Sequence, residues 1–543
     1  MTASDQSGTA RDHPYRVVIV GGGIAGLAAA EALARAELGI HVTLLEARRV
    51  TGGRAGSFQD RESQQAVDYC QHVAMGCCTE LIGLLDRCHV LHHFRRDREL
   101  LFLHRDFAPS RFAASTLLPP PLHLAPALAK LKYLTFVDRL RISAALWKLM
   151  RQTSESLGEM AAGEWLWSHY QTDRTIKRFW DVILVSALGE RTETVSMSMA
   201  RKVIIDGFAA ARGASDVLVP TRPLTEVFGI GVSDALKQLG VQLETSVTVQ
   251  QIAVSGDIGS GDVEDPLGSS VKIDVVGGEP YLADHVIVAV PWYRLDNLLS
   301  DRTKDLLQTS PLRATDFPAS PITGIHLWLD RRITDQPHAV LVDSLAQWIF
   351  QDPLDDDTTA SDAASGEHYY QVVISARYDE EIDRDALIQQ VMAELRQFFP
   401  DAAHARLLRS RVVTDPKSVF SVTPAVQRSR PATRTAHPWL SLAGDWVQTG
   451  WPSTMEGAVI SGRLAARNAF ANLPNAALSV SDLSLARLDR ARESRPMDDT
   501  TTRGLAGAQE SLRSPTFTGL DCEKAVPLSV GLRRGQLARW ILR

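Results

Sequence analysis

The stretch Arg16–Arg54, RVVIVGGGIAGLAAAEALARAELGIHVTLLEARRVTGGR, decides the fold. It opens with a short β-branched run, Arg16–Val20, which is typical of a buried parallel strand. An Ala/Leu-rich segment that begins near Ile24 predicts a helix. Between them lies a G-x-G-x-x-G pattern made by Gly21, Gly23 and Gly26. Such glycines make a tight turn, let a pyrophosphate approach the backbone, and let the helix pack closely on the strand.

The start of the predicted helix is the expected phosphate site. Free N–H groups at Ile24 and Ala25, together with the helix dipole, favour an anion there. A second apolar strand, His41–Leu45, delivers Glu46 twenty residues after Gly26. That spacing is typical of a carboxylate that binds ribose hydroxyls, and we place the following Ala47 in the same site. The alternative is a structural glycine turn with a solvated Glu46, but the strand–turn–helix context favours a dinucleotide.

A second glycine motif, Gly52-Gly53-Arg54, follows Glu46 closely. The stretch EARRVTGGRAGS, which begins at Glu46, resembles the second flavin motif of the amine oxidase and phytoene desaturase superfamily. The resemblance implies FAD as the cofactor, with Gly53 and Arg54 close to it. An NAD enzyme has no need of a second Gly-Gly-Arg at this point.

A third segment, WLSLAGDWVQTGWPSTMEGAVISGRLAA from Trp439, resembles the last flavin motif of the same superfamily. In relatives the aspartate lies on the ribitol or pyrophosphate side of FAD, and the start of the following helix points at the isoalloxazine. A middle segment, near Val247, resembles the strand that lines the adenine. The implied cofactor residues in the third segment are Gly444, Asp445, Thr454, Met455 and Glu456.

Flavin segments early, midway and late in the chain predict an α/β fold. We expect a Rossmann-like FAD-binding domain assembled from the discontinuous segments 15–96, 212–300 and 432–472. Residues 97–211 and 301–431 then form an α+β substrate domain, with a helical cap and a sheet floor. Residues 1–14 and 473–543 are expected to be mostly disordered, and the polar stretches 255–270 and 352–368 to be surface hairpins. The strands expected in the floor are Thr323–Leu329, Ala346–Phe350 and Tyr369–Ser375.

Composition bounds the functions that the chain can perform. Of 543 residues, 45% are hydrophobic and 22% charged, and the net charge of -6 gives no reason to expect nucleic-acid binding. No apolar run reaches the ~18 residues that span a bilayer, and the first residues lack the apolar core of a secretory signal. We therefore expect a cytoplasmic protein. The cysteines, Cys70, Cys77, Cys78, Cys88 and Cys522, lack the spacing of a zinc site, so we expect small buried thiols and no metal.

Apolar helices with interspersed basic residues are predicted between Leu118 and Leu149. They suit a substrate domain for apolar ligands, or contact with the inner face of the cytoplasmic membrane. An ordinary amphipathic cap is the alternative. The terminal segment VGLRRGQLARWILR, from Val530, is a second candidate for membrane contact. The basic residues interspersed between Leu118 and Leu149 that could contact the membrane are Lys130, Lys132, Arg139 and Arg141.

Four stretches resemble the hydroxysqualene dehydroxylase family: DYCQHVAMGC at Asp68–Cys77, LPPPLHLAPAL at Leu118–Leu128, ARGASDVLVP at Ala211–Pro220 and LAGDWVQTGWPSTMEGAVISG at Leu442–Gly462. The resemblance implies that reduced FAD replaces the allylic hydroxyl of hydroxysqualene with hydrogen, giving squalene. It also implies an apolar isoprenoid substrate and, as partners, the upstream squalene-pathway synthases. A carotenoid-type desaturase, a flavin amine oxidase and a non-enzymatic flavin-fold scaffold are the alternatives.

Loss of the allylic hydroxyl needs an acid that protonates it. The candidates are Asp68, His72 and Asp216, with a satisfied core histidine as the alternative for His72. Relatives usually carry glycine where this chain has Cys70. Because cysteine does not readily take a positive φ, we expect a different backbone geometry there.

Overall fold

The computed structural model describes residues 14–62, 66–254, 271–299, 312–351, 366–378 and 383–473. The chain divides into two units, residues 1–477 and 478–543, and all described residues belong to the first. Nearly all of the predicted lead-in, the predicted hairpin 255–270, residues 352–365 of the second predicted hairpin, Cys522 and residues 474–543 of the predicted tail lie outside the described residues.

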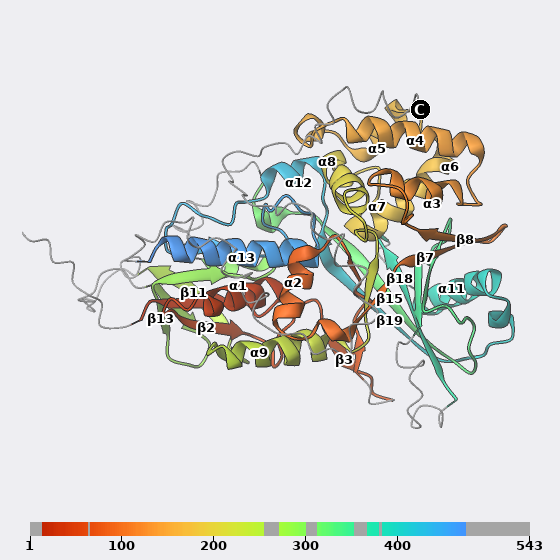
Figure 1. The fold of residues 1–543 in the computed structure, drawn as a ribbon. Helices are drawn as coiled ribbons and strands as arrows, with labels where there is room; N and C mark the ends of the chain where they lie inside the picture. Colours follow the sequence, from red (N-terminus) through yellow and green to blue (C-terminus); the bar gives the residue numbers. More distant parts are fainter. Residues whose placement is uncertain are drawn as a thin grey trace, which may run out of the picture. The chain divides into compact units, whose positions relative to one another are not determined.

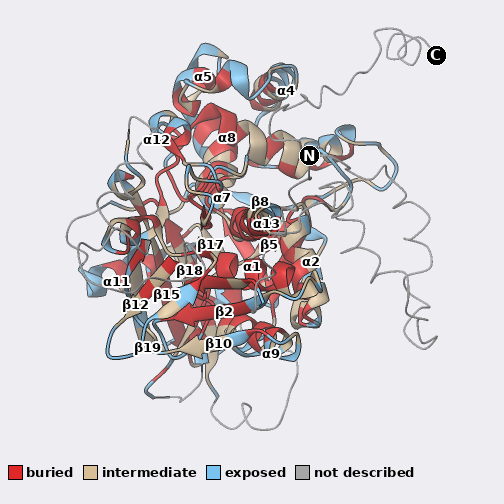
Figure 2. Ribbon diagram, turned by 90° about the vertical axis from the view of Figure 1, so that its left-hand side faces the viewer, coloured by how far each residue is buried: buried red, intermediate tan, exposed pale blue. Residues whose placement is uncertain are grey.

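Five of the described strands form one parallel sheet in the order β10-β2-β1-β14-β20. The apolar residues of β1, β2, β14 and β20 are buried, as Figure 2 shows for β2, whereas the one in β10 is half-buried. The strands come from three distant parts of the sequence, which confirms the predicted Rossmann-like sheet of discontinuous segments. They are β1 (Arg16–Val20), β2 (His41–Glu46), β10 (Gln242–Thr245), β14 (His285–Val288) and β20 (Leu440–Leu442).

Helix α1 (Ile24–Arg35) packs along α13 (Met455–Ala471). Figure 1 shows the two helices side by side, with α2 (Thr79–Arg87) next to α13 and α9 (Ser233–Gln238) next to α1. The contact is close because a Cβ at Gly462 would lie 2.1 Å from the carbonyl oxygen of Ala25. A glycine on α13 therefore brings the last flavin segment against the first.

Smaller sheets surround this domain. Three described antiparallel strands form one of them: β11 (Val249–Val254), β12 (Val271–Val275) and β13 (Tyr281–Ala283). A hairpin joins β3 (Ser57–Gln59) to β4 (Ala66–Asp68). Strand β9 (Val217–Pro220) lies between β5 (Ala74–Met75) and β6 (Phe94–Asp97).

Seven of the described strands form a second large sheet in the order β19-β15-β18-β17-β16-β7-β8. Strands β15, β17 and β18 are neighbours and confirm the three strands predicted here, whereas their role as a cavity floor stays a prediction. One face of the sheet packs against α11 (Arg384–Phe398), with Val372 and Val391 in the shared core. The strands are β7 (Glu99–His104), β8 (Phe107–Ala113), β15 (Ala319–Leu329), β16 (His338–Leu341), β17 (Trp348–Gln351), β18 (His368–Ser375) and β19 (Leu407–Phe420).

Helical segments between residues 122 and 209 form the helical cap (Figure 1). They are η2 (Leu122–Leu124), α3 (Ala125–Ala129), α4 (Phe136–Met150), η3 (Glu155–Leu157), α5 (Ala162–Ser168), α6 (Asp173–Thr175), η4 (Ile176–Trp180), α7 (Asp181–Leu188), α8 (Met197–Arg201) and η5 (Lys202–Ala209). The short segments elsewhere are η1 (Leu91–His93), η6 (Thr225–Val232), η7 (Trp292–Asn297), η8 (Ala314–Asp316), η10 (Pro400–Ala403) and α12 (Pro424–Ser429).

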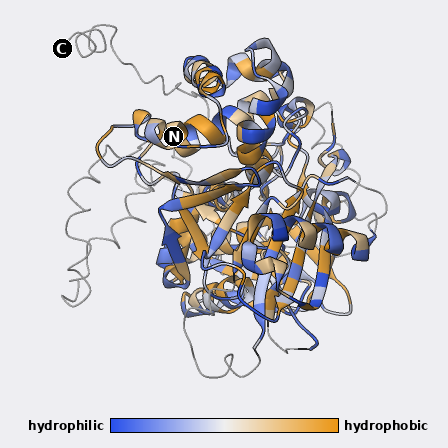
Figure 3. Cartoon of the chain, turned by 90° about the vertical axis from the view of Figure 1, so that its right-hand side faces the viewer, coloured by the Kyte–Doolittle hydropathy of each residue, from blue (hydrophilic) through white to orange (hydrophobic). Residues whose placement is uncertain are grey.

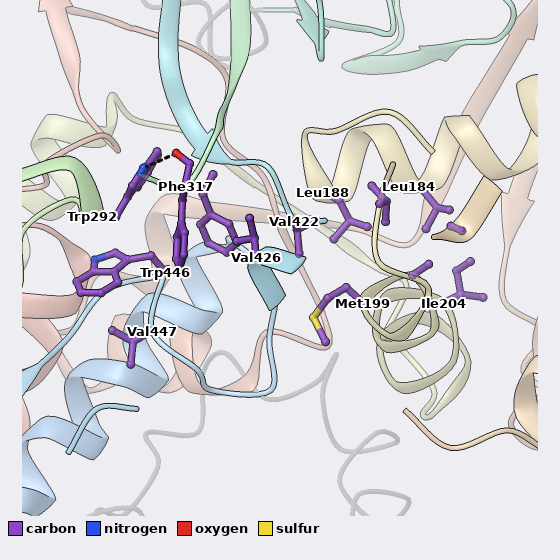
Figure 4. Close-up of a cluster of buried hydrophobic side chains, with 14 of the residues drawn as sticks. Leu184, Leu188, Met199, Ile204, Trp292, Phe317, Val422, Val426, Trp446 and Val447 are labelled. Carbon is purple, nitrogen blue, oxygen red and sulfur yellow. Dashed lines mark hydrogen bonds between the residues drawn. The ribbon is translucent and has the colours of Figure 1, made fainter. Parts of the chain in front are cut away.

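A cluster of buried apolar side chains joins the parallel sheet to the cap. It runs from Val18 of β1 and Trp446, past Val422, to Leu184 and Met199 in the cap (Figure 4). The flavin segments and the cap therefore share a hydrophobic core.

Candidate functional site

The first glycine turn lies at the carboxyl end of β1. A Cβ at Gly26 would lie 2.0 Å from the carbonyl oxygen of Gly21, so the helix starts close against the turn. At Gly23, by contrast, a Cβ would meet no atom of the described chain within 4 Å. Gly23 is also the N-cap of α1, and within the described residues no side chain caps this end, which begins with Ile24 and Ala25. The open, uncapped helix start fits a bound pyrophosphate.

Glu46 lies at the end of the neighbouring strand and is 8% exposed. Its Oε2 accepts a hydrogen bond from the Gly22 N–H at 2.7 Å, and its Oε1 accepts one from the Arg48 N–H at 2.8 Å. Each carboxylate oxygen keeps a further lone pair for a ribose hydroxyl. Val247 donates its N–H to the Glu46 carbonyl at 2.9 Å, although it lies between β10 and β11 and not in a strand. Ala47 follows directly and is exposed.

The second glycine motif folds onto the first. The Gly52 N–H donates to the Gly22 carbonyl at 2.8 Å, and a Cβ at Gly53 would lie 3.1 Å from the Cα of Gly23. Arg54 then reaches the third flavin segment, where its guanidinium forms an ion pair with Asp445. The same guanidinium lies 5.6 Å from the ring centroid of Trp292, a residue that sequence reasoning missed.

Asp445 connects this ion pair to the start of α13. Its carboxylate also accepts a hydrogen bond from the Ser453 hydroxyl. The Thr454 side chain is the N-cap of α13 and accepts from the Gly457 N–H at 3.1 Å, so that Met455 begins the helix. Gly444, directly after β20, donates its N–H to the Ser461 hydroxyl at 2.8 Å. The Asp445 carboxylate thus links Arg54 of the second motif to Ser453, just before the start of α13.

Arg430 is a functional-site residue that sequence reasoning missed. It is 5% exposed, and its guanidinium donates hydrogen bonds to backbone carbonyls of the third flavin segment. The acceptors are Asp445 at 2.9 Å, Trp446 at 3.2 Å, Val447 at 2.5 Å and Trp451 at 2.7 Å. Burial lowers the pKa of this guanidinium to about 10. No motif marks the surrounding sequence RSRPATR, so no signal in a single sequence points to this arginine.

Glu456 departs from the prediction. Its carboxylate accepts hydrogen bonds from the N–H groups of Glu80 at 3.0 Å and Leu81 at 2.8 Å. It therefore caps the start of α2, and its side chain faces that helix. Burial raises the pKa of this carboxyl to about 7. At the start of α13, Glu456 offers a ligand its backbone.

The carboxylates of Asp68 and Asp216 have structural partners. Asp68 accepts hydrogen bonds from the Ser57 hydroxyl at 2.7 Å and the Leu224 N–H at 2.8 Å, which fastens the β3–β4 hairpin to the start of η6. Asp216 forms an ion pair with Arg96, with the two atoms 2.8 Å apart. Each carboxylate is thus held by neighbouring segments, and a role of either residue as proton donor stays a prediction.

His72 lies near the ion pair of the second and third motifs. Its Nδ1 is 2.8 Å from the Cys70 carbonyl oxygen. Burial lowers the pKa of His72, the hydrogen bond with Cys70 opposes this shift, and the charge of Arg54 adds to it. Cys70 does not have a positive φ, as expected for a cysteine at this position. Gly324 makes room, since a Cβ there would lie 2.8 Å from the Tyr69 carbonyl oxygen.

The four described cysteines are free thiols, as predicted. Cys78 and Cys88 are buried, and Cys70 and Cys77 are half-buried. Burial raises the pKa of Cys70 and of Cys88 to about 12, so both thiols stay protonated at neutral pH. A search of the described ranges finds no group of three or more metal-binding side chains.

The fold and the site define a class. The carboxyl ends of parallel strands carry a glycine turn, a ribose-binding carboxylate and a second helix start, as in dinucleotide-binding folds. A second sheet and a helical cap complete the fold of an oxidoreductase that binds a flavin dinucleotide.

Comparison with known proteins identifies the family. The sequence model described as "Flavin containing amine oxidoreductase" matches residues 24–469. The chain is 24% identical over 469 residues to 15-cis-phytoene desaturase of Glycine max, covering 84% of this chain and 79% of that protein. It is 26% identical over 455 residues to hydroxysqualene dehydroxylase of Zymomonas mobilis, covering 82% of this chain and 97% of that protein.

Solved structures share the fold. An oxidoreductase from Methanosarcina mazei matches with a TM-score of 0.60 at 15% identity, covering 82% of this chain and 98% of its own. Cyclohexylamine oxidase from Brevibacterium oxydans matches with a TM-score of 0.56 at 17% identity, covering 84% and 98%. The chain belongs to the flavin containing amine oxidoreductase family, and its cofactor is FAD. Among the helices that the structure describes, none is long and apolar enough to cross a membrane.

Proposed function

We propose that this oxidoreductase removes the allylic hydroxyl of hydroxysqualene by reduction, giving squalene in bacterial squalene and hopanoid synthesis. Reduced FAD supplies a hydride. The substrate loses its hydroxyl as water once a proton has been added, so one hydride and one proton replace C–OH by C–H. The upstream squalene-pathway synthases that make the alcohol are the proposed partners.

The observation that carries the proposal is the apolar cluster between the flavin segments and the cap. Figure 4 shows Trp446 and Val447 of the third segment at one side, and Leu184, Leu188 and Ile204 of the cap at the other. A substrate site that opened beside these buried side chains would be apolar and would suit a long hydrocarbon alcohol. It would also exclude water, so that hydride and not hydroxide captures the allyl cation left when water departs.

His72 is the proton donor that we propose. The structural partners of Asp68 and Asp216 argue against those carboxyls. His72 lies near Arg54 of the second flavin motif, whose positive charge adds to the effect of burial in lowering the pKa of the His72 ring. A positioned acid typically contributes about 10²–10⁴-fold to the rate.

A carotenoid-type desaturase is the second candidate. The similarity to 15-cis-phytoene desaturases, at 24% identity for the Glycine max protein, supports it. Such an enzyme would work in the opposite direction, taking hydride from squalene or phytoene and leaving FAD reduced. The similarity to the Zymomonas mobilis hydroxysqualene dehydroxylase, at 26% identity, supports the first candidate to a like degree.

Anaerobic incubation of photoreduced protein with hydroxysqualene, followed by product analysis, tests the proposal. Squalene formed in step with flavin reoxidation supports it. Flavin reduction by added squalene or phytoene, with conjugated polyene absorbance, supports the desaturase instead. In the same assay His72→Gln is expected to slow squalene formation about 10²-fold or more, whereas the exposed His92→Gln serves as a control.

A further inference from the structure

Helix α4 of the cap is apolar on two opposite faces. Its inner face places Ile142 and Leu149 in the buried core. On the outer face Phe136 is 71% exposed, Leu140 55% and Trp147 52%. At the helical angle per residue these three lie within about 40° of one another, and we call them the α4 stripe. An outer face of this kind is unusual for a helix of a globular protein, which is normally polar towards water.

Exposed apolar side chains gather on this part of the molecule. Of the sixteen large apolar side chains that are exposed among the described residues, nine lie between residues 107 and 170. Figure 3 colours parts of the cap helices orange, as hydrophobic. The apolar surface of the described chain is thus concentrated in and next to the cap, which marks an interaction site. The nine are Phe107, Leu117, Leu122, Phe136, Val137, Leu140, Trp147, Trp167 and Tyr170.

The charge around the α4 stripe identifies its partner. Residues 114–152 contain six lysines and arginines and one acidic residue, Asp138, in a chain whose net charge is -6. The Asp138 carboxylate is buried and paired with Arg174 at 2.9 Å, so it does not offset the positive surface. Lys130, Lys132, Lys148 and Arg151 are exposed.

The structure also sorts the basic residues singled out in the sequence. Lys130 and Lys132 are exposed, whereas Arg139 and Arg141 are half-buried. The Arg139 guanidinium donates to the Leu131 carbonyl at 2.8 Å. Arg151, unlike Arg139, is exposed, and its guanidinium lies 5.9 Å from the ring centroid of Trp147. Apolar side chains surrounded by exposed cations are typical of a helix that lies in an anionic membrane interface.

We propose that the α4 stripe inserts into the interface of an anionic membrane, while Lys130, Lys132, Lys148 and Arg151 bind its head groups. The inner face of α4 belongs to the same apolar cluster as Trp446 in the third flavin segment. In this orientation the α4 stripe contacts lipid. The opposite face of α4 contacts the core that extends to the third flavin segment. In this respect the inference rests on the proposed function, because an apolar isoprenoid alcohol reaches the enzyme from lipid.

Vesicle flotation of the full-length protein tests the proposal. We expect binding to phosphatidylcholine vesicles that contain phosphatidylglycerol, loss of binding at high salt, and little binding to phosphatidylcholine alone. Phe136→Ser with Leu140→Ser is expected to lower vesicle binding at least about tenfold. Each of Lys130→Gln, Lys132→Gln and Lys148→Gln is expected to lower it about fivefold.

The matched control is Val276→Ser with Leu282→Ser, which removes apolar side chains that are 65% and 46% exposed, directly after β12 and in β13, outside the cap. This control should float like the wild type. Wild-type binding by the α4 variants would overturn the proposal, and so would binding that depends on Trp540 and Ile541 alone. A change of oligomeric state in the α4 variants without any vesicle binding would show that a second copy covers the stripe. Flotation needs no turnover, so a failure of the proposed chemistry would leave this result standing.

Discussion

The starts of helices α1 and α13 are held in different ways. At α1 the helix start is defined mainly by the backbone of the glycine turn, in which Gly23 is open. Glu46 adds a single side-chain contact. At α13 side chains fix the preceding loop. Asp445 contacts Arg54 and Ser453, and Arg430 donates hydrogen bonds to backbone carbonyls of this loop. A turn made by backbone leaves a motif in the sequence. A loop held by an arginine from outside the motif leaves no such motif, although its conformation is equally well defined.

Removal of Arg430 should have the largest effect. Arg430→Met leaves four backbone carbonyls of the third flavin segment without their buried donor. We expect a loss of about 3–5 kcal/mol in the free energy of unfolding and loss of bound flavin, measured by urea denaturation and by flavin content. Arg428→Met is the control, because Arg428 is 48% exposed and pairs with an exposed glutamate. Equal, small effects of both substitutions would show that the α13 end does not depend on Arg430.

The second prediction concerns Glu31, whose buried carboxylate connects α1 to α2 and α13. Glu31 of α1 is completely buried and lies 2.6 Å from Arg35, 2.7 Å from Arg87 of α2 and 3.8 Å from Arg463 of α13. Glu31→Gln leaves these guanidinium groups without their shared anion. We expect the free energy of unfolding to fall by about 3 kcal/mol, measured by urea denaturation. The exposed Glu37→Gln should cost almost nothing, and a similar small cost at Glu31 would contradict this role.

The third prediction uses the buried carboxyl of α13. Burial raises the pKa of Glu456 from the ordinary 4.5 to about 7, so the folded protein holds this proton more tightly than the unfolded chain. The contribution to stability is present below the lower value and is lost as pH rises through the upper one. Relative to Glu456→Gln, the wild type should lose about 3 kcal/mol of stability across this range. Urea denaturation at several pH values measures the difference, and a difference that is independent of pH would refute the raised pKa.

Local patterns were enough to predict the elements that depend on local chemistry. The apolar runs of β1, β2 and β14 and the alternation of β15 are sequence features, and the structure confirms each strand. The glycine spacing likewise predicts the turn at α1. In these cases the residues that make the element also carry its signal.

Partners from distant segments could not be predicted in this way. The carboxylates of Asp68 and Asp216 look like candidate acids in the sequence, but their partners, Leu224 and Arg96, are far from them along the chain. Glu456 resembles a cofactor residue because it opens α13, yet it caps α2. A carboxyl group in a sequence does not reveal which backbone or cation it will meet.

The central claim is that the FAD pyrophosphate crosses the open start of α1 at Gly23. Gly23 has a φ of -71°, which alanine also adopts, and a Cβ there would meet no described atom within 4 Å. Gly23→Ala should therefore leave the unfolding of flavin-free protein unchanged within about 0.5 kcal/mol. In the complex with FAD, the added methyl group would collide with the phosphates of the ligand.

The decisive measurement is FAD titration of flavin-free Gly23→Ala protein beside the wild type. We predict at least about tenfold weaker binding without loss of stability, a combination that a merely structural glycine would not give. Wild-type affinity for FAD in this variant would contradict the account.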